Sequence, residues 1–327
     1  MGALMVWTDA TYEEMGATHD FYLDLECGTD TGESGNNTFS AQLPDDVMLE
    51  AGCALFVDGT QWGGVVDRRT SDTDVDGIMQ WEGRTWHGIL AEKALVPDSG
   101  QAYNTASGSV AACIADLITR LDVGDLFAVG DCPSETVSYQ YPRYPDGLTA
   151  LFKMLASVDM RPTFEPTREG GILKVNVGAV GRTTHGDIAD GEMADMEMTA
   201  ELRPYNHVLA LGKGELTQRV VVNRYADANG NISTSKTFTG CQERTIIYED
   251  TNSEEADLIE RAIELLQDAQ GQSEVAVTPD SGMAAGLGDY IIAYDQRIDA
   301  RVTAPITALV VKIDDGTESV DCTAGGA

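Results

Sequence analysis

Short apolar runs separated by turn-forming dipeptides are the feature that most constrains the fold of this chain. Between residues 20 and 100 the apolar runs are FYLDLEC, CALFV, GGVV and GIMQW. The dipeptides Asp58-Gly59 and Asp76-Gly77 lie between them, and such dipeptides favour the positive φ of tight turns. Many short strands with frequent turns are typical of a barrel or sandwich. Residues 1–103 are therefore predicted to form an N-terminal β-barrel domain.

The pattern changes near residue 104, where helical periodicity begins. SGSVAACIADLITRLD predicts a helix capped by Ser107 or Ser109, and DGLTALFKMLASV predicts a second helix capped by Asp146. FEPTREGGILKVNVG then indicates a hairpin, with its turn at Glu169-Gly170-Gly171. Residues 104–200 are predicted to form an α/β module with two helices.

Strand patterns return after residue 201. Asn229-Gly230 lies between two apolar runs and is a strong hairpin indicator. One helix is predicted over 253–270, with Asn252 and Glu255 as a capping box and Gly271 at its end. Further strands are expected in LGDYIIAYD, RIDARVTAP and ITALVVKIDDGTESVDC. The predicted class is β-rich α+β, with two β-barrel-like domains, residues 1–103 and 201–327, bracketing the smaller α/β module.

The net charge of the chain limits the kinds of partner that it can bind. Lys and Arg number 21 against 54 Asp and Glu, which gives a net charge of −33. Such a surface repels nucleic-acid phosphates and anionic membranes, so stable nucleic-acid binding is not expected. The acidity fits either solubility in a salty habitat or a wall along which a polyanion slides without adhering. No apolar stretch approaches the roughly 18 residues of a membrane helix, and we expect neither a membrane anchor nor a signal peptide.

A search for catalytic patterns finds none with the required spacing. There is no HExxH and no GxSxG, and LGKGEL lacks the Walker glycine and hydroxyl. GLGDY lacks a third glycine and predicts a turn leading into a strand. The cysteines form no CxxC pair, so a zinc site is not expected. We expect the cysteines to be free thiols in a reducing cytosol. We predict no catalytic, cofactor-binding or metal-binding residue, no cofactor and no enzyme.

The segment WEGRTWHGIL allows two interpretations. Trp81, Arg84 and Trp86 could stack against a sugar or a peptide. Alternatively, the tryptophans pack into the core near a strand end, Gly83 marks a bend, and the arginine pairs with an acid. We favour the second interpretation.

The segment DTDVDG resembles the start of a calcium-binding EF-hand loop. Asp72, Asp74 and Asp76 alternate, and Gly77 follows. Position twelve of such a loop would be Gly83 rather than glutamate, and the flanking sequences predict strands instead of helices. An EF-hand is excluded on these grounds. A hairpin tip is the favoured interpretation, and a looser calcium loop between strands is the alternative.

Several segments resemble the hub or tip proteins of long-tailed phages and prophages. They are GGVVD followed by EGRTWHGILAEKALVPDSG, then YPRYPDGLTALFKML, RPYNHVLALGKGELTQRVVVNRYADANGNIS and LGDYIIAYDQRIDARVTAPITALVVKIDDG. These matches are scattered over residues 82–316, and the order of the modules is also similar.

The resemblance implies a structural protein with a baseplate-hub-like fold. It implies a homotrimeric ring at the virion tail tip, made in the host cytoplasm, that joins the tail tube to the tip and bounds the DNA exit channel. Distal tail and other tail tip proteins are the implied partners. The chain stops at Ala327, so we expect the hub core alone. A cell-wall-degrading or peptidase tail enzyme and a carbohydrate-binding adhesin are the alternatives.

Overall fold

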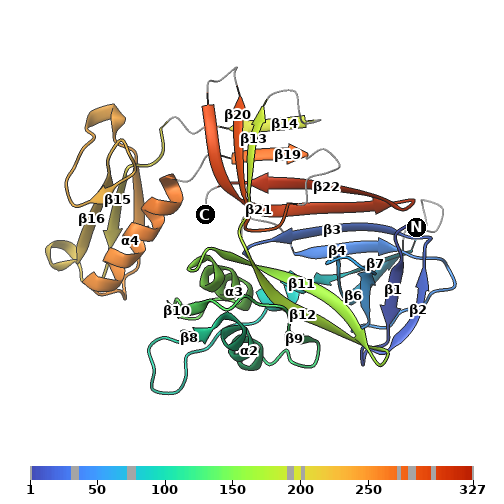
Figure 1. Cartoon of the computed structure of the whole chain (residues 1–327). Coiled ribbons are helices and arrows are strands. Elements are labelled where there is room, and N and C mark those ends of the chain that lie inside the picture. Colours follow the sequence, from blue (N-terminus) through green and yellow to red (C-terminus); the bar gives the residue numbers. More distant parts are fainter. Residues whose placement is uncertain are drawn as a thin grey trace.

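The computed structural model describes residues 2–30, 37–71, 79–189, 195–199, 203–270, 274–278, 285–295 and 300–325, and its course is drawn in Figure 1. Strands account for 45% of it and helices for 18%, which confirms the predicted β-rich α+β class. Several sheets are present, and none of those within the described residues closes on itself.

The largest sheet combines strands from both ends of the chain. Strand β3 pairs antiparallel with β21, and Leu23 lies opposite Ile313. Along the sheet the order is β14-β19-β22-β21-β3-β4-β7-β6-β5-β1-β2, and β13 and β20 join it beside β21. The bounds are β1 Met5–Thr8, β2 Glu14–Thr18, β3 Tyr22–Gly28, β4 Thr38–Gln42, β5 Ala54–Val57, β6 Gly63–Ser71, β7 Met79–Thr85, β13 Thr184–Ala189, β14 Asp195–Thr199, β19 Glu274–Thr278, β20 Tyr290–Asp295, β21 Ala300–Asp314 and β22 Thr317–Ala324.

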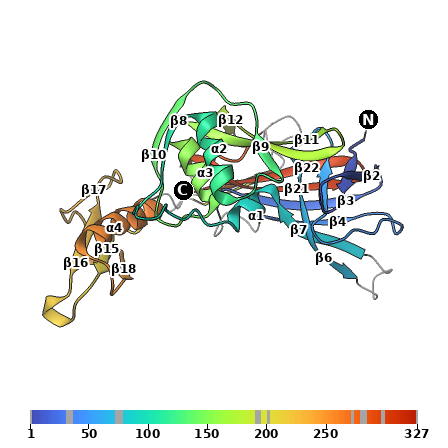
Figure 2. The ribbon, with the colours of Figure 1, turned by 90° about the horizontal axis from the view of Figure 1, so that it is seen from below.

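The helical layer lies beneath this sheet in Figure 1, and Figure 2 shows the molecule from that side. Ser109 and Asp146 cap its two longer helices by accepting hydrogen bonds from Ala112 N (3.3 Å) and Thr149 N (2.8 Å), as predicted. β8 pairs with β10, while β11, β12 and β9 form a separate sheet. The bounds are α1 Trp86–Ala91, β8 Thr105–Ser109, α2 Val110–Leu121, β9 Phe127–Val129, β10 Thr136–Gln140, α3 Gly147–Ala156, β11 Met160–Glu169 and β12 Ile172–Gly181.

Residues 203–270, called the α4 unit below, have a hydrophobic core of their own. Leu258, Ala262 and Leu266 of α4 pack on Val208 and Val222 of a four-stranded sheet with the order β17-β16-β15-β18. The bounds are β15 His207–Leu211, η1 Leu216–Gln218, β16 Val221–Ala226, β17 Ile232–Ser233, η2 Gly240–Gln242, β18 Thr245–Glu249 and α4 Glu255–Gln270. Nearly all other buried apolar residues form one large cluster. The division at residues 103 and 200 stays a prediction.

Two local predictions need correction. The segment after Thr85 continues as the short helix α1, which the apolar run WHGILA did not indicate. The capping box of the fourth helix was also wrong: α4 begins at Glu255, and Asn252 lies earlier, where its N–H donates to the Asp250 carboxylate (3.0 Å). That hydrogen bond forms an Asx turn before the helix instead of a cap.

The predicted turns are confirmed where the structure describes them. The glycines at positions 59, 170, 171, 230 and 316 all adopt positive φ. Gly271 and the whole DTDVDG segment lie outside the described residues, so both interpretations of that segment stay predictions.

Candidate functional site

The segment WEGRTWHGIL spans the end of β7 and the start of α1. Trp81 and Trp86 are each 1% exposed and pack in the main core. Neither ring presents a face to solvent, so they offer no platform for a sugar. Gly83 lies where a Cβ would sit 1.9 Å from the Val65 carbonyl oxygen, which explains a glycine at the close approach of β6 and β7. The favoured interpretation, core tryptophans beside a constrained glycine, is confirmed.

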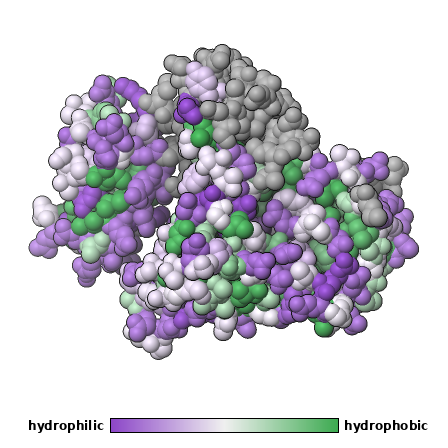
Figure 3. Space-filling view, in the orientation of Figure 1, coloured by the Kyte–Doolittle hydropathy of each residue, from purple (hydrophilic) through white to green (hydrophobic). Residues whose placement is uncertain are grey.

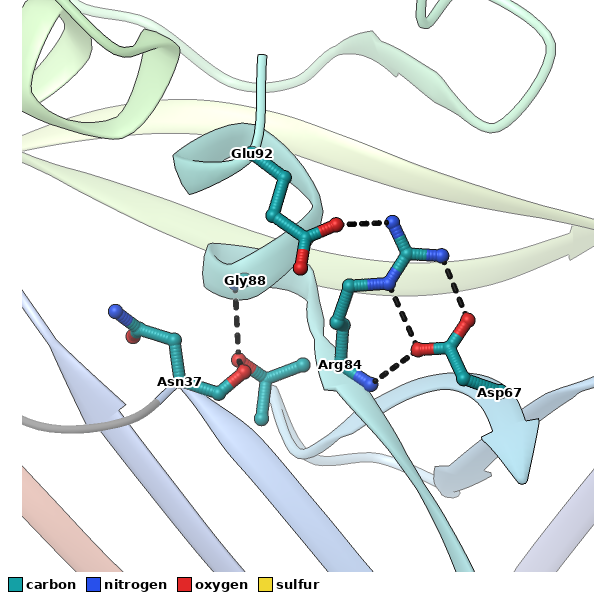
Figure 4. Close-up of polar contacts among 6 residues, drawn as sticks. Asn37, Asp67, Arg84, Gly88 and Glu92 are labelled. Carbon is teal, nitrogen blue, oxygen red and sulfur yellow. Dashed lines mark hydrogen bonds and ion pairs between the residues drawn. The ribbon is translucent and has the colours of Figure 1, made fainter. Parts of the chain in front are cut away.

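Arg84 is held between two carboxylates (Figure 4). Its Nη2 and Nε donate to the Asp67 carboxylate at 2.7 and 2.8 Å, and its Nη1 donates to Glu92 Oε2 at 2.8 Å. Hydrogen bonding to Asp67 is the main cause that raises the pKa of Arg84 above its ordinary value. The network joins β6, β7 and the residue that follows α1. Because both sides of the guanidinium are occupied, Arg84 fixes α1 against the sheet and is poorly placed to bind an external anion.

Thr85 connects the same helix to strand β4. Its hydroxyl accepts a hydrogen bond from Gly88 N (3.2 Å) and donates one to Asn37 O (3.0 Å). Gly88 permits this contact, since a Cβ there would lie 2.3 Å from the Asn37 oxygen. The EGRTWHG segment thus connects α1 to the sheet. Its glycines allow close backbone approaches, and Arg84 and Thr85 make the polar contacts that hold the helix in place.

An acidic groove of about 470 Å³ lies on the sheet surface beside Arg84. Its carboxylates are Asp24, Glu26, Asp67, Glu82 and Glu92. Arg68 pairs with Glu82, and Lys312 lies 3.7 Å from Asp24. These pairs leave a net negative surface. Within the described residues, no group of three or more His, Cys, Asp or Glu side chains could hold a metal ion.

Asp289 is the most buried carboxylate of the described residues and fixes the start of β20. Its Oδ1 accepts from Arg161 Nε and Thr183 N, both at 2.8 Å, and its Oδ2 accepts from Gly286 N at 3.0 Å. His185 Nε2 lies 3.3 Å from the same oxygen. A fully buried carboxylate is tolerated only when donors surround it. These contacts connect the α/β module to the C-terminal strands.

The glycines of GLGDY have separate roles around Asp289. A Cβ on Gly286 would lie 2.3 Å from Arg161 Cζ, and Gly288 adopts a φ of +88°. The segment is a turn leading into a strand, as predicted, and its acid has a structural function. One acid among 54 carries no distinguishing mark in the sequence, so this network could not be predicted.

The histidines occupy four unrelated settings. His19 is exposed, and its Nδ1 lies 2.7 Å from the Ala3 oxygen. His87 is 4% exposed, and burial lowers its pKa to about 3. His185 contacts Asp289, as described above. His207 stacks on Tyr225 with ring centroids 4.4 Å apart and hydrogen-bonds to Thr245 and Asn223.

Burial raises the pKa of five cysteine thiols, those of Cys27, Cys53, Cys113, Cys132 and Cys322. No disulfide joins the six cysteines, Cys27, Cys53, Cys113, Cys132, Cys241 and Cys322. Burial raises the pKa of Cys27 to about 12 and that of Cys322 to about 11. A thiol of that pKa is a poor nucleophile at neutral pH. Separately, no helix of the described chain combines the length and apolar character required to cross a bilayer.

Comparison with known proteins gives matches at the level of structure. No protein-family model and no curated protein sequence matches this chain. The tail protein from Neisseria meningitidis MC58 is 12% identical, with a TM-score of 0.56 and coverage of 99% of this chain and 97% of that one. The 43 kDa tail protein of prophage MuSo2 from Shewanella oneidensis is 13% identical, with a TM-score of 0.56 and 98% coverage of both chains.

A third match comes from an assembled particle. A chain of the phage P2 baseplate in its activated conformation is 11% identical, with a TM-score of 0.51 and coverage of 99% and 98%. At this identity the likeness concerns the fold, and it extends over nearly the full length of these three chains. The chain therefore has the hub-like fold of phage and prophage tail proteins and baseplate components.

Proposed function

We propose that this chain is a structural protein of a phage or prophage tail and forms the hub at the tail tip. In this proposal it joins the tail tube to the tip and contacts distal tail and other tip proteins. The observation that carries the proposal is the two-way coverage of 98% with the Shewanella prophage tail protein. Coverage of both chains means that the whole arrangement of modules is shared, whereas a common domain would account for only part of it.

The polar networks support a structural role. Arg84 and Asp289 each use several donors or acceptors to fix one module against another, and neither presents a free reactive group. The buried tryptophans remove the aromatic surface on which a carbohydrate-binding function would depend. No observation favours the cell-wall-degrading alternative over the structural role.

The finer proposal is a homotrimeric ring whose lumen passes DNA. Carboxylates on the lumen would keep DNA from adhering during ejection, because each phosphate is repelled at short range. The acidic groove beside Arg84 is one surface that would suit such a wall. The surface in Figure 3 is mostly hydrophilic, with separate apolar patches, which also suits a part that contacts protein neighbours at a few places.

Electron microscopy of the purified chain, and of tails that contain it, tests the proposal. We expect three-fold rings at the distal end of the tail tube, labelled by an antibody against this chain. Absence of the chain from purified tails would refute the tail role. A ring with a neutral or basic lumen would refute the DNA-repelling wall and leave the hub in place.

A further inference from the structure

One face of the sheet in the α4 unit is exposed and partly apolar. The strand registers place His207, Leu209 and Leu211 of β15 level with residues of β16 on one side and β18 on the other. We call this surface the open face; its residues are His207, Leu209, Leu211, Val221, Asn223, Tyr225, Thr245, Ile247 and Glu249. Ile247 is 68% exposed and Val221 is 48% exposed, although both lie within strands.

The opposite face of the same sheet is already covered. Val208, Ala210 and Val222 alternate with the open-face residues and pack under α4. In Figure 1 α4 lies on the side of the sheet toward the rest of the chain. The open face is therefore turned away from the remainder of its own chain.

The charge of the open face is unlike that of the molecule. Acids make up 54 of 327 residues. Among the described open-face residues of β15, β16 and β18, however, Glu249 is the one carboxylate. Arg219 forms an ion pair with it. His207 at the other end is only 8% exposed and hydrogen-bonds to Thr245 and Asn223, both at 2.9 Å. Its Nδ1 also lies 3.2 Å from the Glu243 carboxylate, whose charge Lys236 balances. The centre is thus apolar, its polar ends are satisfied by neighbours, and it lacks the surplus negative charge found elsewhere.

This contrast identifies the kind of partner. A partner of opposite charge would be attracted to almost any other part of a chain with a net charge of −33. A partner that is itself strongly acidic is repelled everywhere except at a face without surplus charge, where apolar burial can act. A second copy of this chain is such a partner.

We propose that the open face of the α4 unit binds a second copy of this chain. The inference rests on the proposed homotrimer and specifies the surface that makes it. In a closed ring the contact is heterologous, so the open face of each copy meets a different surface of the next. Ile247 and Val221 form the apolar centre of the contact, and the Arg219–Glu249 pair lies at its edge.

The test measures self-association of the full chain by light scattering, from about 1 µM to about 100 µM protein. Ile247→Asp and Val221→Asp place a carboxylate in the centre of the open face. Met48→Asp is the matched control, because Met48 is 62% exposed and lies outside the α4 unit. Unchanged unfolding curves for all three variants verify the fold. We expect the two open-face variants to weaken association about 100-fold or more, and the control to match the parent chain.

Salt gives a second readout of the partner's charge. Association of like-charged copies strengthens between about 50 mM and about 500 mM salt, since screening reduces their repulsion. If the parent chain associates and both open-face variants associate equally well, this surface is wrong while the proposed ring survives. If the parent chain stays monomeric at every concentration and salt tested, the inference is refuted together with the homotrimer in solution.

Discussion

Replacing His87 by leucine should change how the stability of this protein depends on pH. His87 lies on α1, 4% exposed, with its ring 4.4 Å from that of Phe164 and 6.3 Å from that of Phe152. Its Nδ1 has no hydrogen-bond partner within the described residues. Burial lowers its pKa from 6.5 to about 3, because an apolar surrounding disfavours the charged imidazolium.

The sign follows from proton binding in the two states. The unfolded chain protonates this histidine below about pH 6.5, whereas the folded chain keeps it neutral down to about pH 3. The unfolded state therefore binds more protons in this window, and stability falls as the pH falls. At about 1.4 kcal/mol per pH unit, the loss from this residue reaches about 2 kcal/mol at pH 5.

The assay is urea unfolding followed by tryptophan fluorescence at pH 7.5 and pH 5.0, at constant ionic strength. The lower limit avoids the isoelectric point near 4.1. His87→Leu has no titrating group, so its free energy of unfolding relative to the parent should improve by about 2 kcal/mol between the two pH values. Other carboxylates titrate in both proteins, and their effect cancels in the difference.

The control is His19→Gln, which replaces an exposed histidine and leaves the surroundings of His87 unchanged. An unchanged difference between His87→Leu and the parent at the two pH values would show that the folded protein accommodates a charged His87. The assignment of this ring to a dry, neutral site would then be wrong.

Three further outcomes are expected. Asp289→Ala should lower the free energy of unfolding by about 3–5 kcal/mol, because the partly buried Arg161 loses its counter-charge; a thermal melt within a degree of the parent would contradict this. Gly83→Ala should cost about 3 kcal/mol or more from the clash with the neighbouring strand, while Gly181→Ala, with open space around it, should be near neutral in urea unfolding. Fluorescence of Trp81, which is 1% exposed, should be blue-shifted and resist quenching by acrylamide. Ready quenching would show that the ring is exposed to solvent.

The parts of the fold that could be predicted are those encoded locally. The helices that begin after Ser109 and Asp146 have an N-cap and an apolar stripe within one segment, and both were found. Glycines in the turns at positions 59, 230 and 316 were predicted because positive φ is a local requirement. Helix α1 was missed because it is a short, mostly apolar run directly after a strand, a pattern that fits strand and helix equally well.

The parts that could not be predicted depend on segments distant in the chain. The contact of Arg161 with Asp289 joins segments far apart in sequence, and the residues around each give no indication of its partner. Pairing of β3 with β21 is of the same kind, because each strand alone carries only an alternating apolar pattern. The open face of the α4 unit is also visible only in the structure, since its residues come from three strands.

That same pairing of β3 with β21 has a consequence for how the protein is made. During synthesis the edge of β3 has no partner until the ribosome has passed Asp314 and β21 has emerged. An unpaired strand edge is prone to aggregate, and contacts between residues so far apart in sequence are slow to form. A ribosome that stops early therefore releases a chain whose central sheet has a gap, which chaperones and proteases can recognise. Synthesis through β21 is therefore a condition for pairing that edge of β3.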